Sequence, residues 1–295
     1  MKRFLLFSLF LIIAVSCSKY QVGHALLGMP STRVKTITFE TNPSIPELTF
    51  VYPELKTDPY LAELRETHQL EKVVAEDKTD LEKALSILNW THQQWEHNGS
   101  NEPSKPDALT ILNETKQGKK FRCVEYGLVL TDALQAIGLH ARMLGLKTRD
   151  VETCKAAAGH VLAEVWLKEF NKWSILDGQF NILPVLEGKP LNAVEFQSAI
   201  VQSKPVQFMR KSGIVPKENR RAYFHFISHY LFYFDVSLDE RRLVDNNIRN
   251  KIDGKTRLML VPSGAKNPEI FQQKYPMRYC VYTHSLADFY KPPGL

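Results

Sequence analysis

The chain has 295 residues, 44% of them hydrophobic, which is enough for one large domain or one domain with a substantial extension. Its net charge of +6 includes the two cations Lys2 and Arg3 at the N-terminus, so the remainder is only mildly basic. This balance gives no indication of a nucleic-acid partner, and we expect none.

The N-terminus has the pattern of an export signal. Lys2 and Arg3 precede an apolar run from Phe4 to Val15 that is too short to span a bilayer as a helix. Small residues then lead to Cys17, in a segment that resembles the lipobox of bacterial lipoproteins. The resemblance implies a signal peptide over 1–17, lipidation of Cys17, and a membrane-anchored protein of the bacterial cell envelope, outside the cytoplasm. An ordinary secretory signal with a coincidental cysteine remains the alternative.

The pattern beyond the signal predicts a tether, then helices. Residues 18–50 are mixed in composition and punctuated by proline, as in a tether, and we place the main core over 51–190. Residues 59–99 are helical in pattern: an apolar stripe at 81, 84, 85 and 88 recurs every three or four residues, and Asp80 is a candidate N-cap. A short helix is expected over 108–113.

The middle of the chain predicts one buried helix followed by strands. Residues 123–137 are apolar nearly all round, which is typical of a buried helix, and Gly138 is suited to end it. Strands are expected over 139–146, 160–167 and 173–177, the last two joined by a turn at 168–172.

Residues 191–295 are predicted to be an extension packed on the core. It begins with an amphipathic stretch to residue 203 and a basic loop over 204–221. The aromatic-rich segment 223–236 alternates well enough to predict two buried strands, and shorter apolar runs follow at 258–261 and 279–282.

Cys123, His160 and Asp177 form the candidate catalytic set. Cys123 opens the buried helix, where unpaired N–H groups favour a thiolate, and Lys120 and Arg122 add positive charge just upstream. His160 starts one strand and Asp177 ends the next, so a hairpin would bring the imidazole and the carboxylate together. Each residue alone is more often structural; their order and local structures together point to a nucleophile, its base and the base's orienter.

These residues and their neighbours resemble the transglutaminase-like superfamily. The resemblance covers about residues 80–180, including Cys123-Val124-Glu125-Tyr126-Gly127, 136–142, His160 to Glu164, and Trp173 to Asp177. It implies an α+β, papain-like fold, with the nucleophile helix packed on an antiparallel sheet. By this likeness Cys123 is the nucleophile, His160 the general base and Asp177 the orienter. The sequence departs from the family's pattern at positions that shape the pocket: Phe121, His140, Val161-Leu162 and Gly178.

The implied reaction is acyl transfer from an amide through a thioester, resolved by water in a peptidase or amidase. The expected substrate is a peptide, protein or cell-wall amide, with no cofactor. The backbone N–H of Cys123 is one candidate oxyanion donor, and Gln93 or Gln94 on the preceding helix is a candidate second one. Two alternatives remain: a catalytically silent binding or assembly protein of the cell surface, and a protein-crosslinking transglutaminase.

Two further patterns are a cluster of histidine and glutamate at 92–97 and the remaining cysteines. His92, Glu96 and His97 do not share one helix face, so we expect no metal site there. If Cys17 carries lipid, the three other cysteines include at least one free thiol; a Cys154–Cys280 disulfide and a reduced, buried pair remain equally open.

Overall fold

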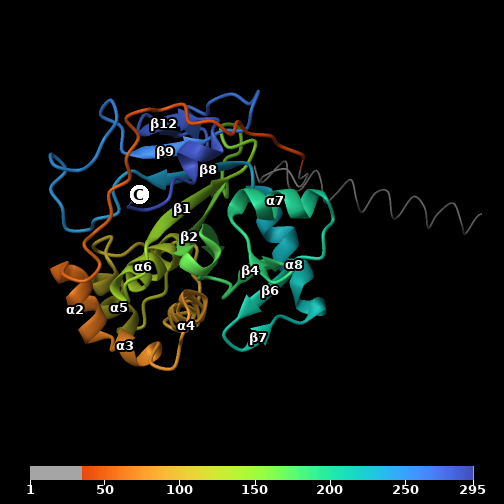
Figure 1. The fold of residues 1–295 in the computed structure, drawn as a ribbon. Coiled ribbons are helices and arrows are strands. Elements are labelled where there is room, and N and C mark those ends of the chain that lie inside the picture. The colour runs from red at the N-terminus through yellow and green to blue at the C-terminus, as the bar shows by residue number, and fades with distance from the viewer. Residues whose placement is uncertain (1–34, 295) are drawn as a thin grey trace, which may run out of the picture.

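The computed structural model describes residues 35–294 (Figure 1). The predicted signal peptide over 1–17, Cys17 and the first part of the predicted tether lie outside the described residues. The helices are α2 (Pro59–Thr67), α3 (Leu70–Val73), α4 (Asp80–His92), α5 (Ala108–Lys116), α6 (Cys123–Ala136), α7 (Ala193–Val201), α8 (Lys217–Ile227) and α9 (Leu286–Phe289), with 3-10 turns η1 (Lys168–Phe170) and η2 (Ser228–Tyr230).

A six-stranded sheet runs through the middle of the molecule in the order β12-β9-β8-β1-β2-β3. Its strands are β1 (Ala141–Lys147), β2 (Gly159–Leu167), β3 (Lys172–Leu176), β8 (Tyr233–Ser237), β9 (Arg257–Leu260) and β12 (Cys280–Thr283). The β12–β9 pair is parallel and the other pairs are antiparallel, so the fold is α+β as expected, but the sheet is mixed rather than purely antiparallel. A parallel pair needs a long connection, and the segment between β9 and β12 supplies it.

Helices α2 to α6 gather against one side of this sheet (Figure 1). Local capping explains where they begin. Asp58 caps α2 with Pro59 in its first turn, Asp107 caps α5, and Thr79 forms a capping box with Glu82 at the start of α4. Asp80, the predicted cap of α4, is instead its first residue. Helix α6 is buried from its third residue onward, as its apolar sequence predicts.

The C-terminal part of the chain covers the opposite face. It contributes α7, α8 and a four-stranded sheet β5-β4-β6-β7, whose strands are β4 (Leu183–Leu186), β5 (Lys189–Pro190), β6 (Gln207–Arg210) and β7 (Gly213–Ile214). It also supplies β8, β9 and β12 to the main sheet, together with a small hairpin of β10 (Ile270–Phe271) and β11 (Tyr275–Pro276). The extension therefore both widens the sheet and covers it.

The prediction of two strands over 223–236 is half wrong. Only β8 is a strand; the first aromatics lie on α8 and η2. The buried, inward-facing side chains of this segment are Tyr223, Ile227 and Tyr230, which are spaced by four and three residues. That spacing follows one face of a helix, and burial on that face outweighs the β preference of aromatic residues.

The prediction of a tether is also wrong for its described part, residues 35–50. It is packed on the extension: Glu40 forms a parallel bridge with Ser285, and Leu48 is buried in the core. Apolar side chains of this segment, Ile37 and Phe39, contact the same cluster. Burial of those side chains outweighs the backbone entropy that a free tether would keep.

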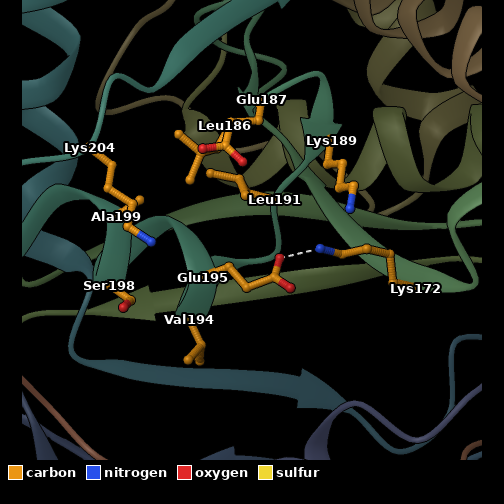
Figure 2. A pocket seen from close by; sticks show the side chains of 10 residues that line it. All are labelled: Lys172, Leu186, Glu187, Lys189, Leu191, Val194, Glu195, Ser198, Ala199 and Lys204. Carbon is orange, nitrogen blue, oxygen red and sulfur yellow. Dashed lines mark hydrogen bonds and ion pairs between the residues drawn. The ribbon is translucent and has the colours of Figure 1, made fainter. Parts of the chain in front are cut away.

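A surface hollow of about 420 Å³ lies between β3, the β4–β5 hairpin and α7 (Figure 2). Its lining mixes apolar residues such as Leu186 and Leu191 with Lys189, Lys204 and the ion pair between Lys172 and Glu195. Cys123, His160 and Asp177 do not line it. Among residues 35–294, no helix is both long and apolar enough to cross a membrane.

Candidate active site

Cys123 is the first residue of α6. Cys123 is half-buried, and its thiol is free. The first N–H groups of a helix have no acceptor within the helix, so the site of the sulfur is favourable for negative charge. The backbone N–H of Arg122, just before the helix, donates to the carboxylate of Glu125 at 3.0 Å, which fixes the direction in which α6 begins.

Gly127 lets this helix lie unusually close to β2. A Cβ atom at this position would come within 2.7 Å of Val161 Cγ1 and 3.1 Å of the Leu162 carbonyl oxygen. Only glycine leaves room for that approach. Since Val161 directly follows His160, the contact brings the first turn of α6 close to the start of β2, which is where the imidazole lies.

His160 and Asp177 are joined by a hydrogen bond. His160 Nε2 lies 2.9 Å from Asp177 Oδ2, and the two residues are only 2% and 1% exposed. The strands β2 and β3 pair as far as Ala163 with Leu176, so Asp177 comes just past the paired segment. If the pairing continued, Asp177 would lie opposite Leu162. It would then be the diagonal neighbour of His160 on the same face of the sheet. The hairpin thus joins the two side chains diagonally and not in direct opposition.

The electrostatics of the site keep His160 charged. Burial is the largest single influence and would lower the pKa of its imidazole, but the charge and hydrogen bond of Asp177, together with those of Cys123, outweigh it. The result raises the pKa of His160 to about 10. Because Nε2 is taken by Asp177, Nδ1 is the ring nitrogen available to Cys123. This is the arrangement that holds a thiolate beside an imidazolium.

The cations just before Cys123 are neutralised, which the sequence did not predict. Arg122 donates to Glu125 and to Glu102, and Lys120 forms an ion pair with Glu96. Charge on Lys120 and Arg122 is therefore balanced by nearby carboxylates. The helix terminus and His160 remain as the groups that favour a thiolate.

The two glutamines proposed as oxyanion donors lie at the C-terminal end of α4. Gln93 is exposed, and the side-chain amide of Gln94 donates to the Trp90 carbonyl oxygen at 2.7 Å. No group of three or more histidine, cysteine, aspartate or glutamate side chains in the described part of the chain is placed to hold a metal ion.

Comparison with known proteins matches the segment that holds the site to a family model. Residues 67–178 match the model of the transglutaminase-like superfamily, a span that contains Cys123 and His160 and ends one residue after Asp177. Over this span the chain is similar to the transglutaminase-like core. No curated protein matches it.

Two solved structures are similar to part of this chain at low identity. A candidate cysteine protease from Cytophaga hutchinsonii is 16% identical, with a TM-score of 0.34 over 48% of this chain and 46% of that one. A candidate protease from Parabacteroides distasonis is 14% identical, with a TM-score of 0.30 over 55% of this chain and 28% of that one. The chain thus spans less than half the length of either.

The surroundings of the transglutaminase-like core add residues that sequence reasoning did not assign to the site. Phe226 and Tyr230 pack on the His160 ring with centroid distances of 5.0 and 5.8 Å, and the Tyr223 hydroxyl donates to Asp177 Oδ2 at 2.9 Å. All three come from α8 and η2, beyond the family match. The helical spacing of these aromatics was the available signal, and it identifies a buried face without saying what that face covers.

His97 is another residue near the site. Burial lowers the pKa of its imidazole, and the charge of His160 lowers it further, while Asp177 and Glu125 oppose the shift. His97 was dismissed in sequence as a metal ligand, and it lies in the loop after α4. His140 and Leu162, two departures from the family pattern, serve the core instead: His140 packs against Tyr52, and Leu162 is fully buried.

Cys154 and Cys280 form no disulfide. Both are free and buried, and burial raises the pKa of each thiol. The reduced alternative therefore holds, and Cys123 is the most exposed of the three cysteines in the described part of the chain.

Proposed function

We propose that this protein is an exported lipoprotein whose Cys123–His160–Asp177 site hydrolyses amide bonds of peptides, proteins or cell-wall fragments. The observation that carries the proposal is the hydrogen bond of 2.9 Å between His160 and Asp177, with Cys123 interacting with the same imidazole. These interactions support the order of nucleophile, base and orienter that thiol catalysis requires.

The first half of the reaction forms a thioester. The Cys123 thiolate attacks the amide carbonyl carbon, and the new C–S bond leaves a negative charge on the carbonyl oxygen. The N–H of Cys123, which has no acceptor within the helix, is a donor for that oxygen. The intermediate then breaks its C–N bond, and the His160 imidazolium gives its proton to the departing amine nitrogen.

The second half returns the enzyme. Neutral His160 takes a proton from water, and the hydroxide attacks the thioester carbon. The C–S bond breaks, the acyl group leaves as a carboxylic acid, and the thiolate is restored beside the imidazolium. Asp177 stays ionised throughout and holds the ring in place. Hydrolysis needs only water as acceptor, whereas crosslinking needs a second site that positions an amine.

The proposed location follows from the N-terminus. Cys17, lipidated and left as the mature N-terminus when the residues before it are removed, would anchor the protein at the membrane of the cell envelope, where peptides and cell-wall amides are within reach. Treatment of cells with a radiolabelled lipid precursor tests this: label on the wild type and none on Cys17→Ala is expected. Label on neither would contradict the lipid anchor.

A panel of peptides and cell-wall fragments tests the chemistry. We expect new amine and carboxyl termini with the wild type and none with Cys123→Ala, while Cys280→Ala, which removes a buried thiol, keeps the activity. Equal behaviour of the wild type and Cys123→Ala on every substrate would favour the silent binding protein. Incorporation of a fluorescent primary amine into glutamine-containing acceptors, without hydrolysis, would favour crosslinking.

A further inference from the structure

Asp177 is held by three hydrogen bonds. Its Oδ2 accepts from His160 Nε2 and from the Tyr223 hydroxyl, each at 2.9 Å, and its Oδ1 accepts from the backbone N–H of Phe180 at 3.2 Å. Phe180 follows on the same loop. Tyr223 comes from α8 in the extension, 45 residues beyond the end of the family match.

We propose that Tyr223 is a positioning residue: its hydroxyl holds the Asp177 carboxylate aimed at His160, so that the imidazole is kept in place beside Cys123. This inference rests on the proposed function and adds to it that the extension completes the active site of the transglutaminase-like core.

Burial makes the hydroxyl necessary. A carboxylate taken out of water is stable only when donors replace the lost solvent. Asp177 is buried, and Tyr223 is buried over it. Burial and the neighbouring carboxylate raise the pKa of Tyr223 well above its usual range, so the phenol keeps its proton and acts only as a donor toward Asp177.

The ring of Tyr223 is held so that the hydroxyl cannot swing away. It packs edge-on against Phe208 at 5.0 Å and against Phe180 at 5.1 Å. One helical turn later Ile227 is fully buried, which fixes α8 on the sheet. A donor held by packing loses little entropy when it forms its bond, and it restricts the carboxylate to one rotamer.

The other polar groups near this pair come from different elements. Cys123 approaches from α6, His97 from the loop after α4, and Tyr230 from η2; Glu125 of α6 faces His97. Cys123 and Asp177 favour the protonated imidazole, and His97 opposes it when charged. Among the side chains of residues 35–294, His160 and Tyr223 are the two that form hydrogen bonds with the Asp177 carboxylate.

The test compares two matched tyrosine variants by NMR titration of the His160 ring. Tyr223→Phe removes the hydroxyl above Asp177. Tyr60→Phe removes another buried hydroxyl that donates to a carboxylate, Asp132, at 2.6 Å, in the interior of the helical layer. Both variants lose a buried hydrogen bond to a carboxylate. Tyr60→Phe also removes the acceptor of the Ala108 backbone N–H, 2.8 Å away, so it is the more disruptive of the two and controls for loss of stability.

We expect the titration midpoint of His160 to fall by about one pH unit in Tyr223→Phe and to be unchanged in Tyr60→Phe. An unchanged midpoint in Tyr223→Phe, or equal falls in both variants, would overturn the proposal. The NMR result does not require turnover, so failure to find hydrolysis would count against the proposed function only.

Discussion

Strand β2 carries two buried ion pairs, and only one of them has a nucleophile beside it. His160 pairs with Asp177 near the start of the strand, and Glu164 pairs with Arg142 four residues later. Both side chains lie on the same face of β2, because residues two and four apart along a strand point in the same direction. Their different surroundings show what separates a site from a structural ion pair.

The Arg142–Glu164 pair is sealed. Both side chains are 0% exposed, and Arg142 donates to Glu164 Oε2 at 2.7 and 2.9 Å and to the Phe289 carbonyl oxygen at 2.9 Å. Aromatic rings close over the guanidinium, with Trp173 at 4.3 Å and Phe289 at 5.0 Å from its central carbon. The His160–Asp177 pair is also buried, but Cys123 beside it is half-exposed. Access to a reactive group, more than burial of charge, distinguishes the candidate active site from the structural pair.

The largest expected effect is on catalysis. Asp177→Asn keeps the size of the side chain but removes the charge that holds His160 protonated and oriented. We expect Cys123-dependent amide hydrolysis to fall about 10⁴-fold, as when the orienting carboxylate of other triads is replaced. Steady-state rates measure it, and Glu164→Gln, at the sealed pair, serves as the comparison. A loss of less than about tenfold in Asp177→Asn would show that the His160–Asp177 contact is structural.

Breaking the Arg142–Glu164 pair should lower the stability of the fold. Arg142→Met leaves Glu164 charged and without a partner in the core, and we expect the free energy of unfolding to fall by about 3–5 kcal/mol. The double variant Arg142→Met/Glu164→Leu removes both charges and should recover most of that loss. Urea denaturation measures both. If the double variant is as unstable as the single one, packing rather than the unpaired charge explains the loss.

The catalytic pair should couple stability to pH. The pKa of His160 rises from 6.5 to about 10 on folding, so the folded state binds this proton more tightly than the unfolded chain. Its stabilising effect is complete below about pH 6.5 and is lost as the pH rises toward 10. The difference in unfolding free energy between the wild type and His160→Gln should shrink by on the order of 5 kcal/mol across this range. A difference independent of pH would contradict the raised pKa.

The smallest effect is expected at the surface. Lys120 is paired with exposed Glu96, so its charge is screened by a carboxylate and by solvent. Lys120→Ala should therefore change the alkylation rate of Cys123 less than about twofold. A larger fall would restore the sequence-based idea that this cation activates the thiol.

The sequence predicted what depends on local pattern. Helix α6, strands β2 and β3, and the three residues at their ends were all expected, because apolar periodicity and turn positions determine them over short distances. The contact of Tyr223 with Asp177 was not, since it joins residues 46 apart and no local pattern reports such a pairing. The helical spacing of the aromatics in α8 is visible in the sequence. Their high β propensity nevertheless favours a strand when only the sequence is considered. The neutralising partners Glu96 and Glu102 were also missed, because loops bring them to Lys120 and Arg122.

Competitive alkylation tests the central claim most directly. The mature protein is treated with a limiting amount of iodoacetamide at a series of pH values from 5.5 to 9, and mass spectrometry measures the modification of Cys123, Cys154 and Cys280. We predict that Cys123 reacts first at every pH, ahead of the buried Cys154 and Cys280, because it is accessible at a helix N-terminus beside His160. A Cys123 that reacts last would contradict the activated thiol on which the proposed activity depends.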